Sequence, residues 1–338
     1  MTPDNAGKVL DLKRSAPSQT QTIDGAPPTS PRARQRRAGF WRSSRWDALP
    51  AFLVFAHLGL LAIFYLEWGG LSWPQRVLGG VAYAASVGWS LDSVAHNFIH
   101  NPFFTWPLLN RVVSYALSFT QGVPQSMYAY VHMRHHAGNS DRIGADGHTI
   151  DPISLYQYGA DAKPEPPLSY VFLQYWRDDG PFTVARKIRA KRPAEANAAM
   201  HEFYAMIALY LVLTIFNWQF LALMAPCYYL GQCLSSLIAY YEHFGADPDE
   251  PLAWGVSTYH PLYNWMFLNN GYHGEHHARP KQHWTQMEAL RRELAVAQKQ
   301  AGLRVIAQPH FLGFLAADAS SIATAKRIRR APPNPQEH

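Results

Sequence analysis

Cysteine is nearly absent from this chain of 338 residues. Only Cys227 and Cys233 occur, and both lie in one apolar stretch. The count excludes a disulfide scaffold, a zinc ribbon and a four-cysteine iron–sulfur site. Charged residues are also scarce, at 16%, whereas 48% of the residues are hydrophobic. The basic residues lie mainly in the tails and between apolar stretches, which indicates membrane orientation and not a nucleic-acid partner.

The apolar residues gather in four blocks that are long enough, or nearly so, to cross a bilayer. The blocks cover about 48–66, 77–94, 202–216 and 221–241. The second block continues without a breaking residue to His100, so a single helix over 73–100 would bring its last turns out of the hydrocarbon. Short turns at 67–75 and 217–220 join the blocks in pairs. This spacing predicts two helical hairpins.

Polar segments complete the predicted organisation. The segment 106–130 is interrupted by Gly122 and Pro124, which predicts an interfacial or re-entrant helix, and 139–192 should form an extramembrane loop or cap. Residues 1–45 lack apolar periodicity and are rich in polar residues, proline and arginine. The predicted domains are a disordered basic tail over 1–45, a membrane-embedded catalytic domain over 46–295 and a polar tail over 296–338.

Lysine and arginine are concentrated before Trp46, in the middle polar segment and at the C-terminal end, and are absent from the two short turns. The positive-inside rule then places both termini and the middle segment in the cytoplasm. The predicted fold class is an all-α, multi-pass integral membrane protein, with four transmembrane helices in two hairpins and a cytoplasmic helical cap. All histidine-rich segments would lie on the cytoplasmic side.

Nine of the sixteen histidines lie in four short motifs, HNFIH, HMRHH, YYEHFG and HGEHH. Residues at i, i+3 and i+4 share a helix face, so each motif can direct several imidazoles to one place. Imidazole suits iron, copper, zinc and nickel. One tetrahedral zinc would use four histidines and leave five unexplained, whereas two metals would use all nine. The predicted metal ligands are His96, His100, His132, His135, His136, His243, His273, His276 and His277.

Nine neutral ligands leave two divalent ions with a charge near +4, which calls for nearby carboxylates that would also orient the rings. The predicted orienting residues are Asp92, Glu242, Glu275 and Asn269, with Asn270 and one of Asp141, Asp146 or Asp151 as further candidates. The remaining histidines lack ligand spacing and are expected to be packed or solvated; they are His57, His148, His201, His260, His283, His310 and His338. Arg134 and Arg142 could meet a substrate carboxylate, a redox partner or a lipid headgroup.

The order H-x-x-x-H, H-x-x-H-H and H-x-x-H-H, with two predicted hairpins between, resembles the integral-membrane fatty acid desaturase and hydroxylase superfamily over about 48–295. NNGYHGEHHARP is similar to the last box of sphingolipid-type desaturases and carotenoid ketolases. YYEHFG is similar to the Tyr-x-Glu-His box of alkane hydroxylases, where this histidine completes nine ligands, but the second box lacks the additional spacing found there. The resemblance implies a non-heme diiron centre that activates O2.

The implied function is O2-dependent oxidation of a fatty acyl or related lipid chain, with desaturation as the leading outcome. Hydroxylation of a hydrocarbon or lipid, and oxidative decarboxylation of a fatty acid to a terminal alkene, are alternatives that site geometry would decide. A membrane zinc hydrolase and a bis-histidine heme electron carrier are alternatives from other classes. The sequence contains no cytochrome b5 module or rubredoxin cysteine set, so an external donor of ferredoxin, rubredoxin or cytochrome b5 type is expected.

Overall fold

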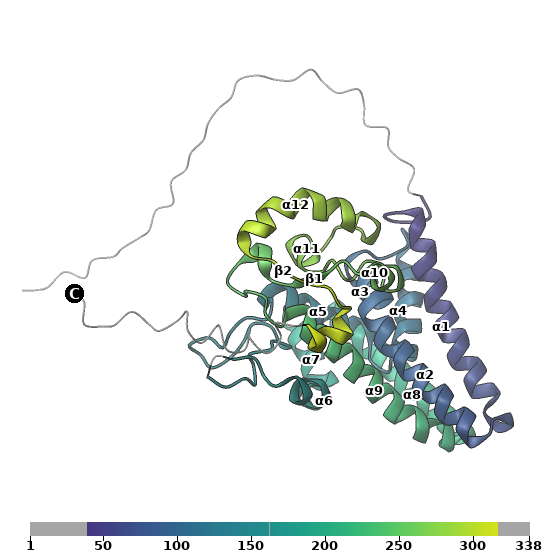
Figure 1. Ribbon diagram of the computed structural model, residues 1–338. Helices are drawn as coiled ribbons and strands as arrows, with labels where there is room; N and C mark the ends of the chain where they lie inside the picture. Colours follow the sequence, from purple (N-terminus) through teal and green to yellow (C-terminus); the bar gives the residue numbers. More distant parts are fainter. Residues whose placement is uncertain (1–38, 162, 317–338) are drawn as a thin grey trace, which may run out of the picture. The chain divides into compact units, whose positions relative to one another are not determined.

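The computed structural model describes residues 39–161 and 163–316 (Figure 1). Most of the predicted N-terminal tail, residues 1–38, lies outside this part of the chain. From residue 39 onward the backbone packs against the segment before α4 (Pro107–Gln121): Trp41 forms an antiparallel bridge with Phe104, and the Arg42 amide donates to the carbonyl of Phe103 at 2.8 Å.

Four long helices run side by side (Figure 1). They are α1 (Ala48–Leu66), α2 (Trp73–Ser90), α8 (Pro193–Phe216) and α9 (Trp218–His243). A π-helical turn, Leu91–Ala95, connects α2 to α3 (His96–His100) without a break in helical backbone, which confirms the predicted continuous helix over 73–100. The turn after α8 is shorter than the predicted 217–220, because α9 already begins at Trp218 and is capped by the Asn217 side chain.

Three described helical segments are long and apolar enough to cross a membrane: Arg45–Leu66, Pro193–Phe216 and Trp218–His243. The second of the four predicted spans, which corresponds to α2, is not among them. Its glycines and serines, and the polar residues at its N-terminal end, lower its mean hydropathy. The third apolar block also extends further than predicted, since α8 begins at Pro193. The arrangement of two membrane-crossing hairpins therefore stays a prediction.

Close packing holds α2 against α9. A Cβ on Gly231 would lie 2.6 Å from Cβ of Val87, and one on Gly88 would lie 2.8 Å from Cβ of Leu234, so the two backbones approach at positions where only glycine fits. Near the C-terminal ends of α1 and α8, the Tyr65 hydroxyl of α1 donates a hydrogen bond to the carbonyl of Leu213 in α8 at 3.2 Å. The turn between α1 and α2 and the turn between α8 and α9 thus lie at one end of the helices, and the histidine-bearing ends of α3 and α9 lie at the other.

The middle of the chain supplies shorter helices. These are α4, α5 (Gln125–Gly138), α6 (Pro167–Arg177) and α7 (Pro181–Arg189). The predicted interruption between residues 106 and 130 is a real break: Gly122 has φ +73°, which ends α4, and Pro124 precedes α5. The buried Glu202 of α8 accepts hydrogen bonds from Ser114 of α4 and Ser126 of α5, and so fixes three helices together.

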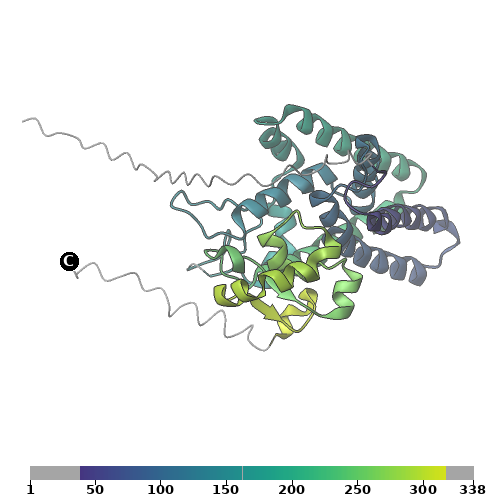
Figure 2. The same ribbon diagram turned by 90° about the horizontal axis from the view of Figure 1, so that it is seen from above.

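The C-terminal third covers the histidine-bearing helix ends. It contains β1 (Val256–Thr258), α10 (Pro261–Met266), α11 (His273–Ala278), α12 (Met287–Ala301), β2 (Arg304–Ile306) and a 3-10 segment, His310–Leu315. In Figure 1 α11 and α12 lie above the long helices, and the view from above in Figure 2 shows them in the foreground.

Two expectations need correction here. The fold is mostly helical and not purely α, because β1 and β2 pair in parallel; strands of three residues are too short to show an alternating pattern. The predicted polar tail also begins later than 296, because β2 and the segment around the fully buried His310 pack into the fold. The rest of that predicted tail, 317–338, lies outside the described residues.

Candidate metal centre

The structure brings all nine predicted histidines together in two adjacent groups. The first group takes two rings from α3, two from α5 and one from α11: His96, His100, His132, His136 and His276. Their Nε2 atoms form a chain of contacts, 2.8 Å between His100 and His132, 3.1 Å from His132 to His136 and 3.0 Å from His136 to His276. In each group the potential ligand atoms lie within 4.8 Å of one another.

The second group combines His135 of α5, His243 at the end of α9, and His273 and His277 of α11. The Nε2 atoms of His243 and His273 are 3.0 Å apart. All four rings are buried. Helices α5 and α11 therefore each contribute to both groups. On each helix the first and last histidines, at i and i+4, belong to one group, and the histidine at i+3 points about 100° away from its neighbour and belongs to the other.

The spacing fits metal coordination. Around a metal with bonds of about 2.1 Å to nitrogen, neighbouring ligand atoms lie about 3.0 Å apart at right angles and about 3.4 Å apart in a tetrahedron. The Nε2 contacts of 2.8 to 3.1 Å match the right-angle arrangement. Nε2 of His277 is buried without a hydrogen-bond partner among the described residues, as expected of an atom whose partner is a metal. These residues thus fit a pair of metal ions.

Acceptors on the outer side hold the rings in orientation. When an Nδ1–H donates outward, the lone pair of Nε2 faces the centre of the group. Four rings have such a partner: His96 with Asn270 Oδ1 (2.8 Å), His135 with Asp151 Oδ2 (2.7 Å), His243 with the carbonyl of Trp254 (2.9 Å) and His277 with Asn139 Oδ1 (2.5 Å).

The sequence matches the fatty acid desaturase family model over residues 71–309, which is most of the described chain and includes every histidine of both groups. The chain belongs to the fatty acid desaturase family.

Curated relatives of this desaturase-family chain are sphingolipid desaturases. The sphingolipid delta(4)-desaturase DES1 of Drosophila melanogaster is 25% identical over 233 residues, which are 65% of this chain and 66% of the fly protein. A DES1-like protein of Arabidopsis thaliana is 26% identical over 68% of this chain and 67% of its own length. The sphingolipid delta(4)-desaturase/C4-monooxygenase DES2 of Mus musculus is 27% identical over 62% and 63%. The chain thus spans just under two thirds of the fly and mouse proteins.

One carboxylate connects the two histidine groups of this desaturase-family protein. Oε2 of Glu242 lies 3.5 Å from Nδ1 of His273, and its Oε1 accepts a hydrogen bond from Nδ2 of Asn270 at 2.7 Å. Since the other end of the Asn270 amide contacts His96, a single polar chain runs from the first group to the second. Glu242 therefore lies between the two groups, and its orienting role stays a prediction.

The other predicted orienting residues lie elsewhere. Asp92 accepts from Ser235 at 2.9 Å, Asn269 donates to the carbonyl of Trp284, and Glu275 accepts from Ser257 and Tyr259. Among the contacts of the described residues, none of these three side chains reaches a ring of either group. Asp92 and Glu275 are nevertheless buried, as are Asp151 and Glu242.

Of the three aspartates weighed after the second box, Asp151 alone contacts a ring. Asp141 instead accepts from the amides of Ile150 and Asp151 and so holds the loop, while Asp146 accepts from the amide of His148. Gly138 allows Asp151 to approach α5 closely, because a Cβ at position 138 would lie 2.4 Å from the amide nitrogen of Asp151.

Sequence reasoning missed three contributors. Asn139, in left-handed conformation at φ 52°, follows a glycine at the end of α5, which is a recognisable helix-end signal. The carbonyl of Trp254 carries no sequence signal at all. His310 lacks ligand spacing, yet it is fully buried, hydrogen-bonds to the carbonyl of Val256 at 2.9 Å and lies 3.6 Å from Glu242.

Electrostatics keeps the ring nitrogens available as ligands. Burial, and then repulsion by neighbouring rings, lowers the pKa of His132, His276 and His277 well below the usual histidine value. Burial likewise lowers the pKa of His310 to about 3. The imidazoles are therefore neutral near pH 7, and a neutral imidazole is the form that binds metal.

Two histidines without ligand spacing have ordinary structural partners. His57 in α1 contacts Oγ of Ser86 at 3.0 Å, and His283 contacts the buried Asp47 at 2.8 Å. The second contact ties the start of α1 to the segment between α11 and α12. Both agree with the expectation of packed, hydrogen-bonded side chains.

Proposed function

We propose that this desaturase-family protein is an O2-dependent non-heme diiron oxidase that desaturates a fatty acyl or related lipid chain. The observation that carries the proposal is the convergence of nine histidines from four distant segments into groups of five and four. Family membership supports action on lipids, and the sphingolipid names of the relatives support a long-chain substrate.

Two iron ions held by the nine histidines would supply the ability to reduce O2 and to oxidise an unactivated C–H bond. The chain itself positions the histidine rings and shields them from water. Asn270, Asp151 and Asn139 hold three rings with their Nε2 atoms inward. The second group and the rings of His96 and His132 in the first are buried away from bulk water, and Glu242 would couple the orientations of the two groups.

Hydroxylation is the second outcome to consider, because the name of the mouse relative includes C4-monooxygenase activity. Oxidative decarboxylation of a fatty acid to a terminal alkene would use the same centre. A zinc hydrolase is disfavoured, since a tetrahedral zinc needs four ligands and one group alone contains five. A bis-histidine heme carrier is disfavoured too, because rings in mutual Nε2 contact leave no room for a porphyrin between them.

The proposal includes the predicted setting. Both termini and the metal centre would face the cytoplasm, membrane lipids would surround the long helices, and a separate ferredoxin, rubredoxin or cytochrome b5 type protein would donate electrons.

The test combines metal analysis with product identification. Protein purified with iron should contain about two iron atoms per chain and consume O2 only when a reductant and a lipid are present. Mass spectrometry of the products separates the outcomes: loss of two hydrogens means desaturation, gain of one oxygen means hydroxylation, and an alkene shorter by one carbon means decarboxylation. One zinc per chain with hydrolysis in the absence of O2 would refute the proposal.

A further inference from the structure

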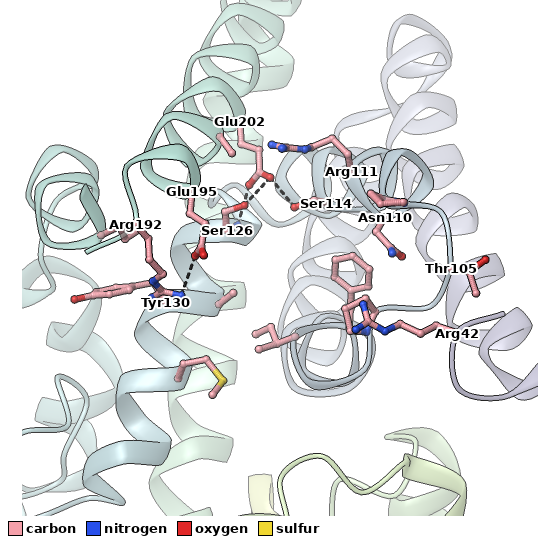
Figure 3. A pocket seen from close by; sticks show the side chains of 18 residues that line it. Arg42, Thr105, Asn110, Arg111, Ser114, Ser126, Tyr130, Arg192, Glu195 and Glu202 are labelled. Carbon is pink, nitrogen blue, oxygen red and sulfur yellow. Dashed lines mark hydrogen bonds and ion pairs between the residues drawn. The ribbon is translucent and has the colours of Figure 1, made fainter. Parts of the chain in front are cut away.

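A cavity lined by both charged and apolar side chains lies beside the first histidine group, between α4, α5, α8 and the segment before α1 (Figure 3). Its volume is about 430 Å³. Figure 3 shows Arg111, Asn110 and Arg42 along one wall, with Arg192, Tyr130 and Glu195 across from them. Neither the metal centre nor the packing of the helices accounts for this set of side chains.

The charges of the cavity do not balance internally. Arg192 forms an ion pair with Glu195 at 2.8 Å. The carboxylate of Glu202 is fully buried and accepts from the Ser126 amide and from two serine hydroxyls, so its hydrogen-bonding capacity is used by α4 and α5. Arg42 and Arg111 are exposed, and no hydrogen bond or ion pair joins their guanidinium groups to another described residue. The guanidinium groups of Arg42 and Arg111 are therefore available to bind a ligand.

A guanidinium fork matches the oxygens of a carboxylate or a phosphate in two parallel hydrogen bonds. The rim of the cavity suggests that the ligand also has an apolar part. Thr105 and Pro107 line the cavity, and between them Trp106 is 62% exposed, with Phe40 packed edge-on to it at 6.1 Å between ring centres. Exposed aromatic rings beside a cationic cavity favour an amphiphile over a free anion.

The cavity is also next to the proposed reaction centre. Ile99 and Met133 line it, and they are the direct neighbours of His100 and His132, whose Nε2 atoms are 2.8 Å apart. Adjacent Cα atoms are about 3.8 Å apart. The helices that carry His100 and His132 therefore form part of the cavity wall, and a polar head held there would leave the first carbons of its chain closer to these helices than the methyl end.

We propose that Arg42 and Arg111 bind the anionic head group, a carboxylate or phosphate, of a single-chain lipid substrate, so that oxidation is positioned by distance from the head. The positioning of oxidation rests on the proposed oxidase function, whereas binding of the head group can be tested without turnover. Arg42 and Arg111 are substrate-binding residues in this account.

Binding is measured by calorimetry on the purified iron-loaded full chain in neutral detergent, with dodecanoate, dodecyl phosphate and dodecanol as probes. The two anionic probes should bind more tightly than dodecanol, and Arg42→Gln and Arg111→Gln should each weaken them about tenfold without affecting dodecanol. Arg42→Lys should lose less than Arg42→Gln. The matched control is Arg45→Gln, an exposed arginine three residues away that does not line the cavity.

Iron content and melting temperature of each variant separate loss of the ligand site from loss of fold. Equal binding of all three probes would overturn the assignment. Unchanged binding of the anionic probes by the variant that combines Arg42→Gln with Arg111→Gln, the double variant, would also overturn it. So would full suppression of dodecanoate binding when phosphatidylglycerol is added to phosphatidylcholine nanodiscs, since the cavity would then belong to bilayer lipid.

Position of oxidation gives the second readout. With acyl chains of different length, the oxidised carbon should stay at a constant distance from the head group, and its position should scatter in the double variant. A constant distance from the methyl end would overturn head-group positioning. Absence of product from any lipid would instead refute the oxidase proposal, while arginine-dependent binding of dodecanoate would still support the cavity as an anionic amphiphile site.

Discussion

Replacing Asp151 by asparagine tests how strongly the surroundings of the histidines hold the metal centre. The carboxylate is fully buried and accepts three hydrogen bonds: Oδ2 from Nδ1 of His135 (2.7 Å) and the amide of Ser140 (2.8 Å), and Oδ1 from the amide of Ile153 (2.9 Å). Asparagine has almost the same shape. It can offer its one oxygen in place of Oδ2, but its NH2 group then faces the amide of Ile153.

One buried donor left unpaired costs about 1–3 kcal/mol in the free energy of unfolding. Loss of the negative charge also makes His135 a weaker ligand, and removal of such a ring partner typically lowers metal affinity about 10- to 100-fold. We therefore expect Asp151→Asn to release iron to a chelator at least tenfold faster than the unmodified protein, and to unfold at lower temperature. Asp151→Ala should be worse, because three donors lose their partner.

The assay follows iron per chain by elemental analysis during dialysis against a chelator, with thermal unfolding in detergent measured in parallel. Asp146→Asn is the matched control: Asp146 lies in the same loop, is exposed and, among the described residues, accepts a hydrogen bond from the amide of His148 and contacts no histidine ring. Unchanged iron retention in Asp151→Asn, or equal losses in both variants, would refute the assigned orienting role of Asp151.

Three further substitutions test other contacts. Gly138→Ala should lose iron as Asp151→Asn does, because its Cβ would lie 2.4 Å from the amide nitrogen of Asp151, whereas Gly180→Ala meets open space and should retain iron by the same analysis. Gly231→Leu should lower the melting temperature in detergent by separating α2 from α9, at about 1–3 kcal/mol for overpacking; an unchanged melting temperature would contradict the close approach. Asn270→Leu should reduce iron affinity about 10- to 100-fold by cutting the chain between the two groups, and wild-type iron retention would show the link to be dispensable.

The cap of C-terminal elements gives the centre its buried environment. Parallel pairing of β1 with β2 brings residues beyond 300 back beside the segment that precedes α11. His310 then packs against Glu242 and hydrogen-bonds to the carbonyl of Val256. A segment that looks like a polar tail in the sequence is therefore part of the wall behind the second histidine group.

Local sequence was sufficient to identify the nine histidines and the long helices. Spacings of three and four residues place side chains on one helix face whatever the rest of the chain does, and apolar blocks of about twenty residues form long helices for similarly local reasons. The same reasoning explains the continuous helix over 73–100, which contains no residue that would break it.

Tertiary structure alone decided how those histidines divide and what orients them. His135 and His136 are adjacent in sequence but belong to different groups, because their directions on α5 differ by about 100° and each meets different helices. Glu275 is a predicted orienting residue and Asp151 only one of three further candidates, yet of the two only Asp151 reaches a ring, since Ser257 and Tyr259 hold the carboxylate of Glu275. Spacing along a helix is set by covalent geometry, whereas contacts between distant segments depend on how the whole chain packs.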